Sequence, residues 1–209
     1  MIEIIPSILA KTQAEFEQMV RKLEPHVERV HLDIIDGKFA PTATIEGFKE
    51  LAAINTKLSF DVHLMVKEPN LESWYESKAD RFILHAESDG DMLDNLMKLE
   101  KSGKRRALAI NPETDTEKII SLMPHLDFIQ FMTVKPGFYG SPFITEVLEK
   151  IKLFHGMHPH MAIAVDGAIT PETAPQVCAA GASLLVSGSY IMESSDIPSA
   201  LNKLSEACS

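Results

Sequence analysis

Short apolar runs alternate with longer segments of helical periodicity along the whole chain, and this alternation limits the fold more than any other feature of the sequence. The runs are rich in Ile, Val, Leu and Phe, which favour strands. We expect strands near residues 2–9, 28–35, 58–65, 81–86, 105–110, 127–133, 161–166 and 183–187. Strands that alternate with helices form parallel sheets, because each helix returns the chain to the start of the next strand.

Residues that favour helix starts stand between these runs. The candidates are Thr12 with Glu15, Asn70, Thr114, and Thr170 with Pro171. About eight strand and helix units fit a closed (β/α)₈ barrel, a TIM barrel, better than an open sheet. An open dinucleotide-binding sheet would carry GxGxxG after its first strand, where this chain reads PSILAKTQ. We therefore expect one α/β barrel domain over residues 1–209.

Composition narrows the partners. A formal net charge of -10 argues against binding to nucleic acid or to an anionic membrane surface. No stretch approaches the roughly 20 apolar residues of a membrane span, and the N-terminus lacks a basic leader. Cys178 and Cys208 have no metal-type spacing and indicate no disulfide framework, which fits a reducing compartment. We expect a soluble, cytoplasmic protein.

Polar side chains fall where several strands end. His31 and Asp33 are two residues apart in one expected strand and so point to the same side, while His63 and Asp166 lie at the ends of two other strands. Two imidazoles and two carboxylates suit Zn²⁺, Fe²⁺, Mn²⁺ or Co²⁺. A single strand histidine is more often structural, but four such groups would be costly to bury unless paired or bound to metal. We expect one divalent metal ion here.

Two further polar residues lie close to these positions. Asp61 shares a side with His63 but lies one strand position deeper, so we expect a structural or supporting role. His85 ends the fourth strand, and we expect it to be structural or to face solvent rather than to contact substrate.

Glycines gather after the last three strands. Loops at this place in TIM barrels commonly hold phosphate through backbone N–H groups. The candidates are Gly137, Gly140, Gly167, Gly188 and Ser189, with Lys135 as a candidate charge partner. Glycines also permit tight turns, but three glycine-rich segments on adjacent loops favour a phosphate site.

Asp33 and Asp166 come from the second and seventh strands, and so from different sides of a barrel mouth. Two carboxylates on opposite faces of a planar enediolate can remove a proton from one face and return one to the other, which inverts a carbon stereocentre. A metal ion between them would polarise a substrate carbonyl. Met65 and Met132 would give apolar walls, although core packing is the commoner role of a strand methionine.

The motifs IIPSILA, HLDIIDGKFAP, DVHLM, NPET, MTVKPGF, VDGAI and VSGSYI occur in the order and at the intervals seen in ribulose-phosphate 3-epimerases, which the chain resembles over nearly its whole length. The resemblance implies a TIM barrel of the ribulose-phosphate-binding type, a divalent metal ion, and interconversion of D-ribulose 5-phosphate and D-xylulose 5-phosphate in the pentose phosphate pathway. It implies that Asp33 and Asp166 are the catalytic acid and base, acting through a metal-stabilised enediolate, and that the metal ligands are His31, Asp33, His63 and Asp166. Implied substrate contacts are Ser7, His63, Met65, Met132, Gly137, Phe138, Tyr139, Gly140, Gly167, Ala168, Gly188 and Ser189. The expected partners are a sugar phosphate and further copies of the chain in a homo-oligomer.

Several positions depart from the usual pattern of that family. They are Ile35, Lys38, Thr42, Tyr139, Ser141 and Ala168. Because these positions concern the pocket lining, the substrate stays open. Hexulose-6-phosphate 3-epimerases, such as those acting on allulose 6-phosphate, resemble the same motifs and are the nearest alternative. A non-catalytic sugar-phosphate-binding barrel is a third hypothesis. Decarboxylases and aldolases of related barrels carry DxKxxD, which DIIDGK does not match.

Overall fold

The computed structural model describes residues 2–137 and 140–208, and its eight strands form a closed parallel barrel. Each strand neighbours the next in sequence, and the last strand pairs with the first to close the barrel. The strands are β1 (Glu3–Ile8), β2 (Arg29–Ile35), β3 (Ser59–Met65), β4 (Arg81–His85), β5 (Arg105–Ile110), β6 (Phe128–Met132), β7 (Ala162–Asp166) and β8 (Leu184–Ser187). The predicted TIM barrel and all eight predicted strands are confirmed.

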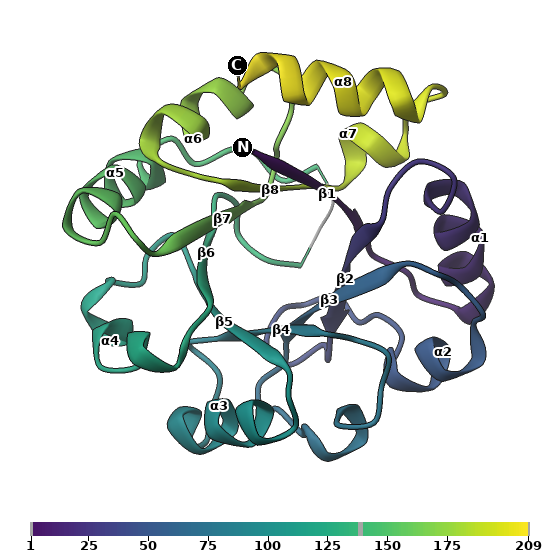
Figure 1. Ribbon diagram of the computed structural model, residues 1–209, viewed down its shortest axis with the longest axis horizontal. Helices are drawn as coiled ribbons and strands as arrows, with labels where there is room; N and C mark the ends of the chain where they lie inside the picture. The colour runs from purple at the N-terminus through teal and green to yellow at the C-terminus, as the bar shows by residue number, and fades with distance from the viewer. Residues whose placement is uncertain (1, 138–139, 209) are drawn as a thin grey trace.

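Helices surround the barrel on its outer side (Figure 1). They are α1 (Gln13–Leu23), α2 (Phe48–Ala53), α3 (Met92–Lys101), α4 (Glu117–Ile120), α5 (Val147–Met157), α6 (Ala174–Ala180), α7 (Ser189–Met192) and α8 (Ile197–Ala207), with short 3₁₀ turns at η1 (Glu72–Trp74) and η2 (Met123–His125). Among the described residues, every helix is too short or too polar to cross a membrane.

The predicted helix starts are right at one position and partly or wholly wrong at the others. Thr12 caps α1, because its hydroxyl accepts the N–H of Glu15. Asn70 does accept the N–H of Glu72, but the helical segment expected after it is only the 3₁₀ turn η1. The connection between β3 and β4 is therefore mostly irregular.

Two other helices start later than predicted. Helix α4 begins at Glu117, whose N–H bonds to the Asp115 carboxylate, so Thr114 is not its cap. Helix α6 begins at Ala174, because the Thr173 hydroxyl accepts the N–H of Thr170 and holds the preceding residues in a turn. In both cases a polar side chain other than the predicted cap accepts a backbone N–H near the start of the helix.

Alternation along each strand divides the core into two parts. On β2 and β3, outward-facing apolar residues pack against the helices, and this outer core includes Leu32, Val62 and Phe60. Inward-facing residues of the other strands, such as Ile83, Ala107 and Ala164, fill the barrel interior. The same alternation turns the polar residues of β2 and β3 inward, so the barrel interior must satisfy their charges.

Ion pairs fill the amino-terminal end of the barrel. The Arg29 guanidinium lies 2.6 Å from one Asp61 oxygen, and the Arg81 guanidinium lies 3.3 Å from the other. Arg81 also reaches Glu3 of β1 at 3.5 Å. Asp61 is therefore a structural residue at the barrel floor, defined here as Glu3, Arg29, Asp61 and Arg81. Of the two roles predicted for Asp61, these ion pairs favour the structural one.

Cys178 and Cys208 form a disulfide, contrary to the prediction from their spacing. The cysteines are 30 residues apart in sequence, but their Cα atoms are 5.9 Å apart. Cys178 lies in α6 and Cys208 directly follows α8. These two helices are neighbours on the outside of the barrel (Figure 1), a proximity that the sequence spacing does not reveal.

Candidate functional site

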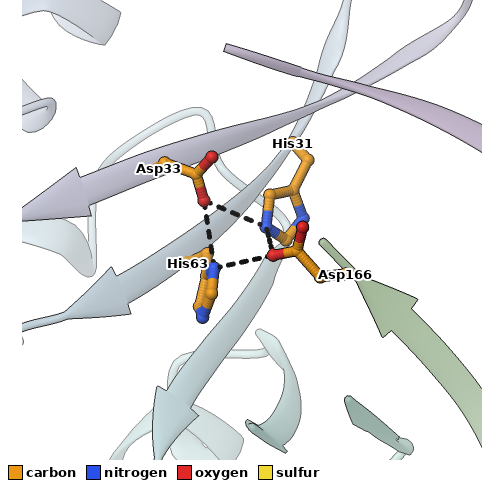
Figure 2. Close-up of side chains that lie close together, drawn as sticks. All are labelled: His31, Asp33, His63 and Asp166. Atoms are coloured by element: carbon orange, nitrogen blue, oxygen red, sulfur yellow. Dashed lines mark hydrogen bonds and ion pairs between the residues drawn. The ribbon is translucent and has the colours of Figure 1, made fainter. Parts of the chain in front are cut away.

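Four side chains at the carboxyl ends of three strands point to one place. They are His31 and Asp33 of β2, His63 of β3 and Asp166 of β7, and one donor atom of each lies within 4.8 Å of the others. Asp33 is in register with His63 on the neighbouring strand. Figure 2 shows each carboxylate turning one oxygen toward the imidazoles. The structure thus brings together all four of the residues predicted to bind metal.

Specific atoms face the centre of this cluster. The Nδ1 atom of His63 is 3.0 Å from Oδ1 of Asp33 and 3.3 Å from Oδ2 of Asp166. The Nε2 atom of His31 is 3.4 Å and 3.6 Å from the same two oxygens. Two nitrogens and two oxygens therefore surround one point, with each aspartate contributing a single oxygen.

The donor set fits a divalent cation. Nε2 of His31 is buried and makes no hydrogen bond to the described residues, although it faces two carboxylates. A buried polar atom without a partner is costly, and coordination to a metal ion would satisfy it. Two imidazoles and two carboxylates form a mixed nitrogen and oxygen set of the kind that first-row divalent metals accept. The cluster could therefore hold a divalent metal ion.

The charges of the cluster alter its acid–base properties. Burial alone would raise the pKa of Asp33, but the adjacent imidazoles of His31 and His63 outweigh burial and hold that pKa well below its usual range. Burial alone would lower the pKa of His63, but the carboxylates of Asp166 and Asp33 raise it to about 9. At neutral pH the imidazole of His63 is therefore protonated, and its positive charge lies between the two carboxylates.

A cavity opens directly above the cluster. Its lining includes both aspartates together with most of the residues predicted to contact substrate: Ser7, Met65, Met132, Gly137, Gly140, Gly167, Ala168, Gly188 and Ser189. His63 is fully buried and lies among the cluster residues rather than in the cavity lining. Phe138 and Tyr139 lie outside the described residues. Lys135 is exposed and is not part of the lining.

The glycine-rich segments approach the cavity with unusual backbone angles. Gly137, Gly140 and Gly167 have φ values of 116°, 74° and 120°, and Ala168 has a φ of 51°. A side chain at Gly167 would lie 2.5 Å from a methyl group of Val134, so only glycine fits there. Backbone N–H groups presented by turns can hold an anion without a charged side chain.

Two residues of the site were missed by the sequence reasoning. Gln130 of β6 is fully buried in the barrel, and its amide nitrogen donates to Oδ2 of Asp166 at 3.1 Å. Glu87 accepts a hydrogen bond from Nδ1 of His85 at 3.0 Å. Both could have been noticed, because Gln130 interrupts an apolar strand on the side of Met132, and Glu87 shares a side with His85 by alternation.

The side chain of His85 is fully buried, so of the two expected roles, structural or solvent-facing, the structure excludes the solvent-facing one. Its Nε2 lies 2.9 Å from Nε2 of His63. Burial lowers the pKa of His85 to about 4 despite the nearby Glu87 carboxylate. The imidazole of His85 is therefore neutral at pH 7, and it contacts His63 on the side away from the aspartates.

Comparison with known proteins places the chain among sugar-phosphate enzymes. A sequence model described as the ribulose-phosphate 3 epimerase family matches residues 3–192. Proteins named ribulose-phosphate 3-epimerase are similar to the chain: the one from Bacillus subtilis is 35% identical and covers 98% of this chain and 98% of its own length. The one from Chlamydia pneumoniae is 36% identical, covering 92% of this chain and 88% of its own length.

Solved structures show the same fold at low sequence identity. A 3-hexulose-6-phosphate synthase superposes with a TM-score of 0.73 at 15% identity and covers 100% of both chains. A 3-keto-L-gulonate-6-phosphate decarboxylase from Vibrio cholerae superposes with a TM-score of 0.74 at 11% identity, covering 99% of this chain and 97% of its own. These likenesses support the barrel fold.

Proposed function

Because the chain belongs to the ribulose-phosphate 3-epimerase family of carbohydrate isomerases, we propose that it is a metal-dependent 3-epimerase that interconverts D-ribulose 5-phosphate and D-xylulose 5-phosphate. The observation that carries the proposal is the pair Asp33 and Asp166. Both line the cavity, and both hold one oxygen against the buried imidazoles. Each carboxylate therefore keeps its second oxygen for a substrate.

The two carboxylates divide the proton transfer between them. One removes the proton from C3 of the ketose, and the electron pair of the broken C–H bond moves toward the adjacent carbonyl to give an enediolate. The other carboxylate gives a proton to C3 from the opposite face, which inverts that carbon. In the reverse direction the two roles exchange. Met65 and Met132 line the cavity beside the aspartates and keep water from the planar intermediate.

His31, Asp33, His63 and Asp166 would hold the metal ion. A divalent cation in this site would polarise the substrate carbonyl and stabilise the negative charge that develops on its oxygen. We propose Zn²⁺, Fe²⁺, Mn²⁺ or Co²⁺, because a mixed set of two nitrogens and two oxygens suits each of them.

The substrate phosphate would bind to backbone N–H groups. Gly137, Gly140, Gly167, Gly188 and Ser189 all line the cavity, and Ala168, like Gly167, has a positive φ. Neutral amide donors explain how a protein with a net charge of -10 holds a phosphate. Ser7 of β1, in register with His31, would contact the sugar.

Epimerisation assays with metal-depleted protein test this proposal. The protein is stripped with chelator and resupplied separately with each of the four ions, and ribulose 5-phosphate is compared with allulose 6-phosphate. Metal-restored turnover of the pentulose is the expected result. Preference for the hexulose would keep the mechanism and change the substrate. Binding of either sugar phosphate without turnover or solvent-proton exchange at C3 would contradict epimerase activity and favour a binding protein.

The proposal also includes a compartment and an assembly state. We propose a cytoplasmic homo-oligomer, because enzymes of this family are metabolic and such barrels often associate; the Cys178–Cys208 disulfide is unusual for a reducing compartment and makes the location the first point to test. Cell fractionation and light scattering of the purified protein test these two points. A monomer at micromolar concentration would contradict the oligomer.

A further inference from the structure

A chain of buried and partly buried hydrogen-bonding groups runs from His63 to the start of the loop after β5. Nε2 of His63 lies 2.9 Å from Nε2 of His85, and Nδ1 of His85 lies 3.0 Å from Oε2 of Glu87. The other Glu87 oxygen accepts the backbone N–H of Asn111 at 2.9 Å. Figure 2 shows the ring nitrogen of His63 that enters this chain pointing away from the aspartates.

The direction of each hydrogen bond follows from the groups present. An ionised carboxylate can only accept, so Nδ1 of His85 must donate to Glu87. A neutral imidazole has one N–H, so Nε2 of His85 must accept. Nε2 of His63 must then be the donor, which leaves the lone pair of a neutral His63 on Nδ1.

That lone pair lies where the cluster needs it. Nδ1 is the atom of His63 that faces Asp33 and Asp166. The two carboxylates attract a proton to Nδ1, whereas a cation between them requires a free lone pair there. The amide nitrogen of Gln130 lies 3.4 Å from both ring nitrogens of His63 and so favours neither tautomer, whereas the shorter contact with His85 favours a proton on Nε2.

We propose that Glu87 and His85 act together as positioning residues for metal binding, fixing the tautomer and the ring plane of His63. The pair, called here the His85 relay, is built rigidly. The rings of His63 and His85 stack with centroids 4.9 Å apart and planes 21° apart, and both side chains are fully buried. Phe39 covers His85 with its ring centroid at 4.5 Å.

The relay is held by backbone as well as by side chains. The N–H of Phe39 donates to the Asp36 carboxylate, which also accepts the N–H of Lys67 after β3. The N–H of Asn111 cannot accept a hydrogen bond, so it fixes the position of a carboxylate oxygen of Glu87. The relay therefore has one arrangement of donors and acceptors rather than two.

Replacing Glu87 by glutamine should reverse the relay. The Asn111 N–H would take the amide oxygen of Gln, which turns the amide nitrogen toward His85. That nitrogen donates, so Nδ1 of His85 must accept and its Nε2 must carry the proton. His63 would then accept at Nε2 and carry a proton on Nδ1, where the metal ion would bind.

Cobalt and zinc binding to the full-length protein test the relay. We expect Glu87→Gln to weaken Co²⁺ and Zn²⁺ binding about 10- to 100-fold and to change the visible absorption of the Co²⁺ form. Glu87→Asp, which keeps an acceptor-only group, should recover part of the affinity. Glu113→Gln makes the same charge change at an exposed position beyond β5 and should leave metal affinity unchanged. Glu87→Gln binding within twofold of the unsubstituted protein would overturn the relay.

Nitrogen-15 NMR of the unsubstituted zinc-loaded protein gives a second test that needs no folded variant. The expected signals show a proton on Nε2 of His63 and on Nδ1 of His85. A His63 signal with its proton on Nδ1 would overturn the relay. The relay rests on the proposed function only in requiring the metal site, so a protein that passes both tests but epimerises neither sugar phosphate would contradict the function and leave the relay standing.

Discussion

The amide nitrogen of Gln130 lies 3.1 Å from Oδ2 of Asp166, the carboxylate oxygen that also faces His63. Gln130 is fully buried, and its own carbonyl oxygen has no hydrogen-bond partner among the described residues. The side chain thus gives one hydrogen bond to a proposed catalytic group and leaves another polar atom unsatisfied. A residue kept at such a cost is expected to matter more for Asp166 than for the stability of the barrel.

Gln130→Leu tests this relationship. Loss of the N–H donor should leave Asp166 less well oriented and lower kcat about tenfold, as expected for a hydrogen bond to a charged group worth roughly 1.5 kcal/mol. The free energy of unfolding should change little, because the unsatisfied carbonyl is removed together with the donor. Gln176→Leu, at an exposed position on α6, is the matched control. An unchanged kcat with a less stable protein would show that Gln130 serves the core alone.

Asp33→Asn and Asp166→Asn should each remove most of the epimerase activity. Neither amide can accept a proton from C3, so we expect kcat to fall about 10²- to 10⁴-fold. Circular dichroism should show an intact barrel. Metal content must be measured in the same samples, because both residues belong to the metal cluster. A near-normal rate in either variant would refute the two-carboxylate mechanism.

Metal uptake should release a proton from His63. The aspartates raise the pKa of this residue to about 9, so it is protonated at pH 7.5 and must lose that proton to bind a cation through Nδ1. Asp33, with its lowered pKa, is already ionised. We expect release of about one proton per metal ion and an affinity that rises with pH up to about 9 and then levels off. Calorimetry in buffers of different ionisation enthalpy measures the number of protons released. A metal affinity that does not change between pH 7 and pH 9 would contradict proton release from His63.

Gly167→Ala should destabilise the barrel and weaken substrate binding. A side chain there would meet Val134 at 2.5 Å with φ at 120°, and we expect a loss of about 2 kcal/mol or more in the free energy of unfolding. Gly90→Ala is the control, because its φ is 98° but no atom lies within 4 Å of the added carbon. Backbone strain alone should then cost about 1 kcal/mol. Urea unfolding separates the two effects, and equal losses would exclude the contact with Val134.

Removal of the Cys178–Cys208 disulfide should lower stability without abolishing activity, because the bond lies on the outside of the barrel. For a closed loop of this length, the loss is about 3 to 4 kcal/mol. Dithiothreitol should lower the thermal midpoint of the natural protein and leave that of a Cys178→Ser, Cys208→Ser double variant unchanged. Detection of two free thiols in unreduced, denatured protein would disprove the bond.

The strands were predictable because each is a short apolar run, and apolar runs reveal burial directly. The helix starts at Thr114 and Thr170 were not, because several polar side chains compete for the same N–H groups. Asp115 and Thr173 capture them in the folded chain. Such competition is decided by backbone geometry that a residue pattern does not contain.

The four residues of the candidate metal cluster were predictable for a different reason. His31 and Asp33 share a strand, so alternation alone aims them together, and the parallel order brings β3 and β7 to the same end of the barrel. The contacts of Glu87 and Gln130 depend on which atoms meet inside the closed barrel. The disulfide likewise depends on the packing of α6 and α8, which are separated in sequence by β8 and α7.

The barrel floor closes the amino-terminal end of the barrel in the described part of the chain. Arg29, Asp61 and Arg81 fill the amino-terminal end with paired charges, so within the described residues the cavity is reached from the carboxyl ends of the strands. Under the proposed function, substrate and product would enter and leave at this same end of the barrel. The two epimers would then compete for one binding site, and accumulation of either one would slow binding of the other.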